Sequence, residues 1–414
     1  MSLSNFTKKI LNIKENNLKI LSIEDINIKN VVTKQISAIL SKKKAKCPHC
    51  SSKKTIKNGF KIVNIKMLKA FGYDTVLKVA KQRYICKDCN KSFMLNLDIV
   101  EPCATISKNT KLAIVLELRK SKSLKDIAEQ FSVSQSTVRK IFEDLPPFKN
   151  NYNYLPEVLC FDEFKSTKDI NGAMSFIYCD ANTSKIVDIV EDRKLKSLQD
   201  HFSNYPKSVR DKVKNIVIDM HSPYISLVKS MFPKANLSID RFHLVQLINR
   251  AFNKIRVTTM NRQNNRMYNK LKKHWKLLLM NSLNLSDKKV LRNKMFDYKY
   301  LSQEDMVNIM LSCDKNLKNS YNLYQEILIA IQDKNFKKFK EIVENNYNKV
   351  NEIMKTVLKT FKKYFEYIEN SLNFEYSNAR VEGSIRKIKV LKNIAYGFRS
   401  FVNFKKRILL CANF

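Results

Sequence analysis

Two aspartates each follow a short apolar segment. Each segment is predicted to be a buried strand, so each carboxylate would lie at the end of a strand. Asp219 follows the run from Ile216 to Ile218, and Asp162 follows the run from Val158 to Phe161. Open α/β sheets carry their chemistry at the carboxyl ends of buried strands, so we expect both carboxylates at one edge of a sheet. A single aspartate in such a position is more often a turn former, and it is the pair that favours a site.

The segments around these aspartates occur in an order that is typical of one fold. Strands are predicted at residues 158–161, 173–179 and 185–190, then a helix at 195–202, the Asp219 strand, a helix from Ser222, and a strand at 235–239 that ends at Asp240. The turn-forming residues 180–184 predict that the second and third strands pair as a hairpin. This is the ribonuclease-H-like order, which makes the first and fourth strands neighbours and places Asp162 beside Asp219.

A helix near the C-terminus carries a third carboxylate. Ser377 or Asn378 can cap a helix that contains Glu382, and Arg386 and Lys389 share its face four and seven residues later. The alternative is that Glu382 and Arg386 form an ordinary surface ion pair. Residues 257–372 lack Gly and Pro and predict a helical insertion before this helix, with Lys-rich faces that either bind DNA phosphates or are simply solvated. We expect the aromatic and basic tail, residues 395–410, to pack on the sheet.

Two C-x2-C pairs lie in the N-terminal part of the chain, Cys47 with Cys50 and Cys86 with Cys89. Each pair can form a knuckle that directs two thiolates at one tetrahedral zinc ion, and two knuckles complete a four-cysteine site. A hairpin must fill the gap between them, with a strand from Val76 to Ile85. His49 could replace one cysteine, although we expect it to point outward. The alternative is two unrelated redox or free-thiol pairs.

A basic helical stretch follows the cysteines. A helix is predicted from Thr110 to Leu118, and the apolar pattern from Leu124 to Ile141 matches a helix-turn-helix with its second helix opened by Ser134. The residues that would face the major groove of DNA are Gln135, Ser136, Arg139 and Lys140. The alternative is a plain helical hairpin.

The charge balance indicates a polyanionic partner. The 414 residues carry a formal net charge of +39, which favours nucleic acid, with a membrane surface as the alternative. Part of the lysine excess fits the bias of an AT-rich genome. No apolar run approaches the ~20 residues of a transmembrane helix, and the N-terminus does not read as a signal peptide, so we expect a cytoplasmic protein. The nine cysteines do not form a disulfide framework in such a compartment.

The chain resembles the ISL3 family of insertion-sequence transposases over nearly its whole length. The resemblance rests on the cysteine pairs, the helix-turn-helix, Phe161-Asp162-Glu163, Ile218-Asp219-Met220 with Tyr224, residues 232–235, residues 240–243, Ser377-Asn378 with Glu382-Gly383, residues 387–389 and residues 396–399. Two positions depart from the family pattern: Ile385 stands where Asn is usual, and Asn393 where Arg is usual.

The resemblance implies a bacterial DDE transposase that is associated with the nucleoid. It implies an α/β multi-domain fold, in which a ribonuclease-H-like catalytic domain is interrupted by a helical insertion and preceded by a zinc ribbon and a helix-turn-helix. Matched motif by motif, the triad falls on Asp162, Asp219 and Glu382, which would hold magnesium or manganese. Crowded carboxylates repel one another without metal, so we expect Arg386 and Lys389 either to offset that repulsion or to hold DNA phosphates.

Further expectations concern neighbours and partners. We expect Asp240 and His243 near the triad in a structural or substrate-positioning role. The implied partners are double-stranded DNA, as terminal inverted repeats and as target, and further copies of the chain in a homodimer or higher oligomer. No membrane partner is expected.

The predicted domains follow the motifs in order. Residues 1–45 have no assigned role, 46–104 form the zinc ribbon, 105–147 the helix-turn-helix, 155–256 the first part of the catalytic domain, 257–372 the insertion, and 373–414 its final helix and tail. One rival function is a DNA-binding regulator without catalysis, against which the three intact carboxylates argue. A second rival is a nuclease of RNA hybrids, against which the helix-turn-helix argues.

Overall fold

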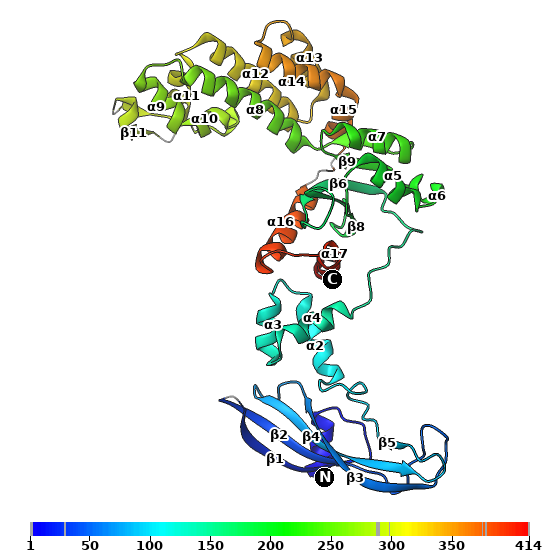
Figure 1. The fold of residues 1–414 in the computed structure, drawn as a ribbon. Helices are drawn as coiled ribbons and strands as arrows, with labels where there is room; N and C mark the ends of the chain where they lie inside the picture. The colour runs from blue at the N-terminus through cyan, green and yellow to red at the C-terminus, as the bar shows by residue number, and fades with distance from the viewer. Residues whose placement is uncertain are drawn as a thin grey trace. The chain divides into compact units, whose positions relative to one another are not determined.

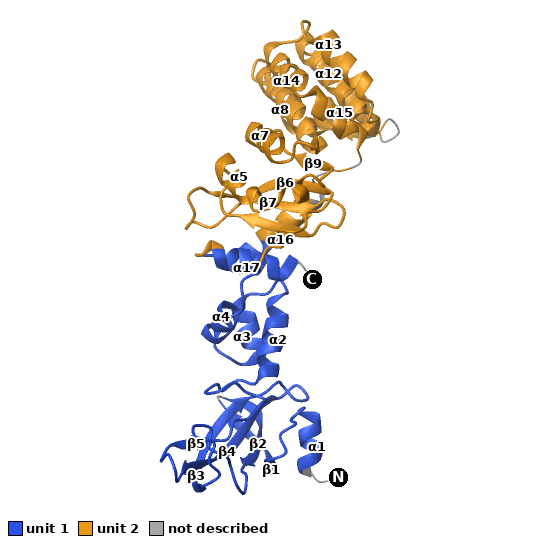
Figure 2. Cartoon of the chain, turned by 90° about the vertical axis from the view of Figure 1, so that its right-hand side faces the viewer, with its two compact units in different colours: residues 1–148, 390–398, 402–414 blue, residues 149–389, 399–401 orange. Residues whose placement is uncertain are grey.

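The chain folds into two compact units, which Figure 2 colours separately. The computed structural model describes residues 3–28, 30–286, 290–297, 299–374, 376 and 379–412. Unit 1 comprises residues 1–148, 390–398 and 402–414, and unit 2 comprises residues 149–389 and 399–401. No helix among the described residues is long and apolar enough to cross a membrane.

Unit 1 begins with a five-stranded sheet of order β1-β2-β4-β3, with β5 paired to β4 (Figure 1). Its elements are α1 (Leu3–Ile10), β1 (Leu18–Ile28), β2 (Val31–Leu40), β3 (Thr55–Lys66), β4 (Asp74–Cys86) and β5 (Ser92–Met94). The antiparallel pair β3–β4 confirms the hairpin predicted between the cysteine pairs. The parallel pair β2–β4 brings residues 1–45 into the same sheet. Alternate residues of these strands, among them Ile36, Leu77 and Val79, form one buried core.

Three short helices follow in unit 1: α2 (Lys108–Leu118), α3 (Leu124–Phe131) and α4 (Gln135–Glu143). We call them the three-helix unit. Each begins after a serine whose hydroxyl accepts a hydrogen bond from the first turn, which satisfies one of the free backbone N–H groups there. α3 ends at Ser132, in the left-handed conformation with φ 51°, and the Ser132 hydroxyl donates to Asp74 Oδ1 on β4 at 2.8 Å.

The C-terminal helix α17 (Phe401–Ala412) packs against the three-helix unit, with Leu410 in the same apolar core. The start of the tail contacts the part of the chain that holds the sheet, where Phe401 N donates to Asp169 Oδ2 at 2.8 Å, between β6 (Val158–Lys165) and β7 (Met174–Asp180). The expectation that the whole tail packs on the sheet was therefore wrong for the residues around Leu410. Buried cations explain the difference: Arg407 donates to the carbonyls of Lys120 (3.1 Å) and Lys122 (2.8 Å), beyond the end of α2. Lys406 donates to the carbonyl of Glu143 at 2.9 Å, at the end of α4. Cations at helix C-termini satisfy carbonyls that have no partner within the helix.

The sheet of unit 2 has the order β10-β9-β6-β7-β8. Its elements are β6 (Val158–Lys165), β7 (Met174–Asp180), β8 (Ile186–Val190), α5 (Leu195–Ser203), α6 (Lys207–Arg210), β9 (Asn215–Ile218), α7 (Ser222–Met231) and β10 (Asn236–Ile239). The first and fourth strands, β6 and β9, are parallel neighbours, and β7 and β8 form a hairpin, as predicted. Asp162 lies inside β6 and not at its end, because β6 continues to pair with β7 as far as Lys165.

A helical part follows β10 without a break. Its elements are α8 (Arg241–Met260), α9 (Asn265–Lys273), α10 (Trp275–Leu279), η1 (Ser282–Asn284), β11 (Leu291–Asn293), η2 (Lys294–Phe296), β12 (Lys299–Leu301), α11 (Gln303–Leu311), α12 (Lys315–Gln332), α13 (Phe336–Asn346), α14 (Glu352–Lys363) and α15 (Phe365–Asn373). The small β11–β12 hairpin is an exception to the all-helical prediction. α8 is continuous across residue 257, where the sequence placed the start of the insertion.

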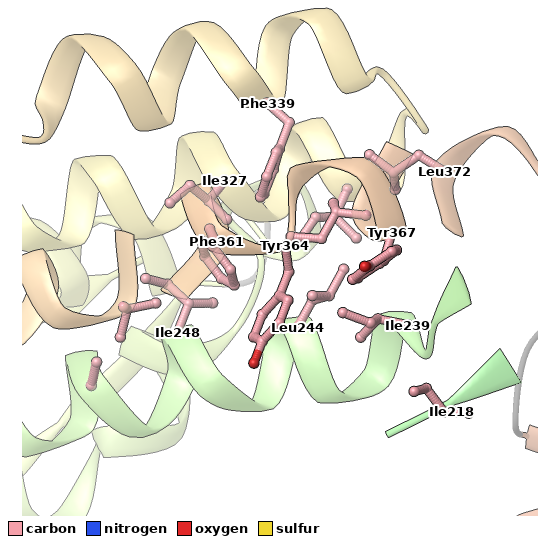
Figure 3. Packing of buried hydrophobic residues seen from close by; sticks show 14 of the residues in the cluster. Ile218, Ile239, Leu244, Ile248, Ile327, Phe339, Phe361, Tyr364, Tyr367 and Leu372 are labelled. Carbon is pink, nitrogen blue, oxygen red and sulfur yellow. The ribbon is translucent and has the colours of Figure 1, made fainter. Parts of the chain in front are cut away.

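The insertion shares one hydrophobic core with the sheet. Figure 3 shows Tyr364 and Tyr367, at the start of α15, close to Leu244 and Ile248 of α8 and to Ile239 of β10. The side chains of Asn370 and Ser371 donate to carbonyls of β10, at 2.9 and 2.5 Å, and so cover the edge of the sheet. The insertion is thus attached to the strand edge next to the Asp219 strand.

Candidate functional site

The two aspartates predicted from the sequence lie together at the centre of the unit 2 sheet. β6 and β9 are in parallel register from Val158 opposite Asn215 to Cys160 opposite Val217, and continuing that register by two residues places Asp162 opposite Asp219. Burial of the Asp162 side chain, followed by the nearby charge of Asp219, raises the pKa of Asp162 to about 7. Two neighbouring carboxylates repel each other, and a shared proton or a bound cation relieves that repulsion.

His243 joins this pair from the first turn of α8. Its Nε2 lies 2.8 Å from Asp219 Oδ1. Burial alone would lower the pKa of His243, but the hydrogen bond to Asp219 and the charges of Asp219, Asp240 and Asp162 raise it overall. Asp240 is buried and precedes α8 as its N-cap. The 2.8 Å contact fits the positioning role expected for His243, since a hydrogen bond from the ring would restrict the orientation of the Asp219 carboxylate.

Glu163 is a functional candidate that the sequence analysis missed. Its two carboxylate oxygens each accept a hydrogen bond from Arg193 Nη1 at 2.6 Å, and Oε2 accepts one from the Tyr224 hydroxyl at 2.9 Å. Side chains alternate along a strand, so Glu163 and Asp162 point to opposite faces of the sheet. The signal in the sequence was the adjacency of Glu163 to Asp162, but nothing in the pattern identified Arg193 as its partner.

Glu382 lies in the first turn of α16 (Ala379–Ile394). Its carboxylate is 3.5 Å from Arg386 Nη2, with the two side chains 41% and 79% exposed, so the surface ion pair that was the alternative reading is formed. Lys389 is exposed, and Ile385 is buried, which explains why an apolar side chain is tolerated there. The predicted cap, Ser377 or Asn378, lies outside the described residues.

Among the described residues, one group of three or more potential metal ligands has all its ligand atoms within 4.8 Å of one another, and that group is the four cysteines. The structure therefore brings Asp162 and Asp219 together, but it does not place Glu382 in such a group with them. The donor chemistry of the aspartate pair, hard oxygens in a partly buried setting, suits magnesium or manganese.

The four cysteines form a site with the donor set of structural zinc. Their sulfurs lie close across the two knuckles, with Cys47 and Cys89 Sγ 3.7 Å apart and Cys50 and Cys86 Sγ 3.5 Å apart. Both knuckles close in the same way, since Ser51 N donates to Cys47 O and Asn90 N donates to Cys86 O, each at 3.0 Å. Backbone N–H groups of Cys89 and Asp88 lower the pKa of the Cys86 thiol to about 7, which favours the thiolate that zinc binds. The residues present fit a four-sulfur zinc site.

The predicted recognition residues lie on the outer face of α4. Gln135, Ser136, Arg139 and Lys140 are exposed, whereas Val138, Ile141 and Phe142 of the same helix are buried in the three-helix unit. The helix therefore presents polar and cationic groups on the side that does not pack.

Two family models match the chain. A model described as a transposase of the ISL3 family matches residues 159–408, and one described as the zinc-finger of transposase IS204/IS1001/IS1096/IS1165 matches residues 43–89. The first covers the aspartate pair, the insertion and α16, and the second covers all four cysteines.

One curated protein is also similar to part of the chain. It is described as an "ATP-dependent protease" from Lactococcus lactis subsp. lactis and is 39% identical over 111 residues, which are 27% of this chain and 36% of that protein. The chain thus matches about a third of that protein's length, and a match of this extent carries no activity across.

Proposed function

The chain belongs to the ISL3 family of transposases, and on that premise we propose that it cuts and joins DNA at the ends of its insertion sequence with a DDE triad. The observation that carries the proposal is the pair Asp162 and Asp219 on adjacent parallel strands, within the segment that matches the family. The strand order of unit 2 supports a ribonuclease-H-like catalytic domain, with α8–α15 as its insertion.

Asp162 and Asp219 would hold divalent cations, and Glu382 would complete the site. Bound magnesium or manganese supplies charge for an attacking water and for the leaving 3′-oxygen of a phosphodiester. The protein side of the chemistry is positional. His243 orients Asp219 through the 2.8 Å contact. Arg386 and Lys389, on the helix that carries Glu382, would hold phosphates of the same DNA strand. The freed 3′-hydroxyl would then attack a phosphodiester of target DNA held beside the same carboxylates, so that a new phosphodiester forms as the 3′-oxygen of the target strand leaves.

The three-helix unit would deliver the catalytic domain to the terminal inverted repeats as a helix-turn-helix. Support comes from the exposed polar face of α4 and from the turn at Ser132, which lets α3 and α4 cross. Cutting two ends of one element requires two catalytic centres, so we propose that the protein acts on DNA as a homodimer or higher oligomer.

A regulator without catalysis is the second candidate, because the Glu382 carboxylate is paired with Arg386 and not grouped with the aspartates. It would keep the zinc ribbon and the DNA-reading helices but would not cut. Binding without cleavage by the wild-type protein, in magnesium and in manganese, would favour this candidate.

The test of the triad uses charge-removing substitutions of nearly the same shape. We expect Asp162→Asn, Asp219→Asn and Glu382→Gln each to abolish magnesium-dependent cleavage and strand transfer on duplexes that carry the element's ends, while binding to the same duplexes is nearly unchanged. Each removes a ligand charge, and loss of such a residue costs orders of magnitude in rate.

The matched control is Asp200→Asn, on the exposed side of α5, where Asp200 forms a solvent-exposed ion pair with Lys196 at 3.1 Å. It should cut at the wild-type rate. If Glu382→Gln also cuts at that rate, the third ligand has been misassigned. Glu375, the first alternative, lies outside the described residues.

A further inference from the structure

A pocket of about 340 Å³ opens beside Asp219, on the face of the sheet that carries Glu163. Glu163, Asp219 and His243 are among its lining residues, but Asp162 is not. The pocket therefore borders the catalytic carboxylates through Asp219 and extends away from Asp162. A molecule in it would lie next to the group that reacts and not at that group.

The base of the pocket is polar, and its Glu163 carboxylate is paired with a cation. Tyr224 is 1% exposed, and its hydroxyl donates to Glu163. The Glu163 charge is balanced by the two 2.6 Å contacts from Arg193. His221 stands against Tyr224 with ring centroids 4.8 Å apart. Within the described part of the chain, the buried Nδ1 of His221 has no hydrogen-bond partner, so the pocket contains a polar atom that a ligand could satisfy.

One wall comes from α8 and from the helical insertion. Gln246, Leu247 and Arg250 follow His243 along one side of α8, and Thr360 of α14 adds a hydroxyl. Together they offer an amide with donors and acceptors, an apolar side chain, and an exposed guanidinium that can bind phosphate in a bidentate manner. This set of groups matches the parts of a nucleotide.

We propose that this pocket, the Tyr224 pocket, holds one nucleotide adjacent to the scissile phosphate, turned out of the duplex. The inference rests on the proposed function, since the DNA strand at Asp219 is what supplies the nucleotide. A volume of about 340 Å³ is at the small end of ligand sites, so it accommodates a single unpaired nucleotide and not a stacked base pair. The base lies against His221 and Gln246, and its phosphate lies at Arg250. Enzymes that do chemistry on a base extrude its nucleotide into such a pocket, and flat side chains can replace the lost stacking.

Fluorescence of 2-aminopurine reports whether a base leaves the stack. The probe is placed in turn at each nucleotide on either side of the cleavage point, in duplexes that carry the element's end, and binding is measured in magnesium-free buffer so that no cleavage is needed. We expect wild-type protein to raise the fluorescence severalfold at one position next to the cleavage point. Leu247→Trp, which fills the pocket, should bind the duplex without that rise.

Arg250→Ala should weaken the fluorescence change, whereas Lys254→Ala should leave it as in the wild type. Lys254 is the matched control because it is an exposed cation on the same helix that does not line the pocket. Binding without a fluorescence rise at any position overturns the proposal, as does a full rise in Leu247→Trp.

Cleavage provides a second and independent readout. With an abasic site at the responding position, the blocked variant has no base to accommodate. We therefore expect Leu247→Trp to cut the normal duplex about tenfold or more slowly than wild type, the scale of a lost base-stacking contact, and to recover on the abasic duplex. Equal cutting of the normal duplex by both proteins overturns the pocket and leaves the proposed function intact. A wild-type protein that raises the fluorescence but never cuts overturns the proposed catalysis and supports the pocket.

Discussion

At Asp162, burial and a neighbouring carboxylate act in the same direction. Both raise the pKa of its carboxyl group, to about 7, well above the ordinary value of about 4. His243 is bonded to the other member of the pair and also has a raised pKa. The magnesium-free protein therefore retains protons at this centre that an unfolded chain would release.

The consequence is a pH dependence of stability. A carboxyl whose pKa is higher in the folded state than in the unfolded state makes folding less favourable as pH rises from about 4 to about 7. We expect the free energy of unfolding of unit 2, in magnesium-free buffer, to fall over this range, by at most about 1.4 kcal/mol for each unit of pKa shift. The measurement is urea denaturation at a series of pH values, followed by the fluorescence of Trp275.

Asp162→Asn should flatten this dependence without removing it, because His243 contributes in the same direction: its raised pKa stabilises the folded state at low pH and that stabilisation is lost as pH rises. Added magnesium should reverse the wild-type trend. A wild-type protein whose stability increases between pH 5 and 7 without magnesium would contradict the assignment.

A second prediction for individual residues concerns the four cysteine sulfurs. We expect purified protein to contain about one zinc per chain, and Cys86→Ser to lose it, because a structural site needs all four thiolates. Elemental analysis gives the metal content, and hydrogen exchange of β3 and β4 should become faster in the variant. Cys103→Ser, at an exposed cysteine outside the cluster, is the control. A folded protein without zinc would refute the site.

Among the elements, α17 differs most from its prediction, because it packs on α2–α4. It completes the packing of α2–α4, although about 260 residues separate Lys406 from the carbonyl oxygens that it binds. The helix that carries Glu382 (α16) and α17 are consecutive helices in the chain.

We expect Arg407→Met to destabilise the three-helix unit by about 1.5–3 kcal/mol, the range for hydrogen bonds to charged groups. The carbonyls of Lys120 and Lys122 would lose their buried donor. Native-state hydrogen exchange on the full chain should show faster exchange in α2–α4 and no change in α12. The control Lys125→Met removes an exposed cation from α3. It should leave hydrogen exchange unchanged both in α2–α4 and in α12. Unchanged exchange in Arg407→Met would mean that α17 does not stabilise these helices.

For the whole molecule, the excess of 77 basic over 38 acidic residues is a long-range property. It predicts tight, salt-sensitive binding to any DNA, since each phosphate contact adds roughly 0.9 to the slope of log affinity against log salt. Sequence preference must come from a few side chains at base edges.

Substitution of Arg139 distinguishes sequence-specific base contacts from non-specific phosphate contacts. We expect Arg139→Ala to weaken binding to the terminal repeat by roughly 1–3 kcal/mol and to leave binding to unrelated duplex nearly unchanged. Lys125→Ala, a nearby cation off the outer face of α4, should lower both affinities slightly and equally. The measurement is a titration at several salt concentrations, and an equal loss on both duplexes would make Arg139 a phosphate contact.

Local patterns in the sequence determined the elements and the zinc site. The C-x2-C knuckles depend on turns of a few residues, the serine caps define the starts of α2–α4, and runs of buried residues mark β6 and β9. Even the adjacency of Asp162 and Asp219 followed from the order of strands, because few topologies connect such an order.

Contacts between distant segments were decided only by the tertiary structure. The extension of β6 beyond Asp162 depends on how far β7 reaches, the place of residues 1–45 depends on the pairing of β2 with β4, and the partner of Glu163 is a residue 30 positions away. The packing of α17 on α2–α4 uses an apolar face and two buried cations. Any basic amphipathic helix offers these features, so they do not identify its partner in the sequence. Hydrophobic periodicity shows that a face will be buried but not against what, because many surfaces of similar polarity compete for it and only the whole fold selects one.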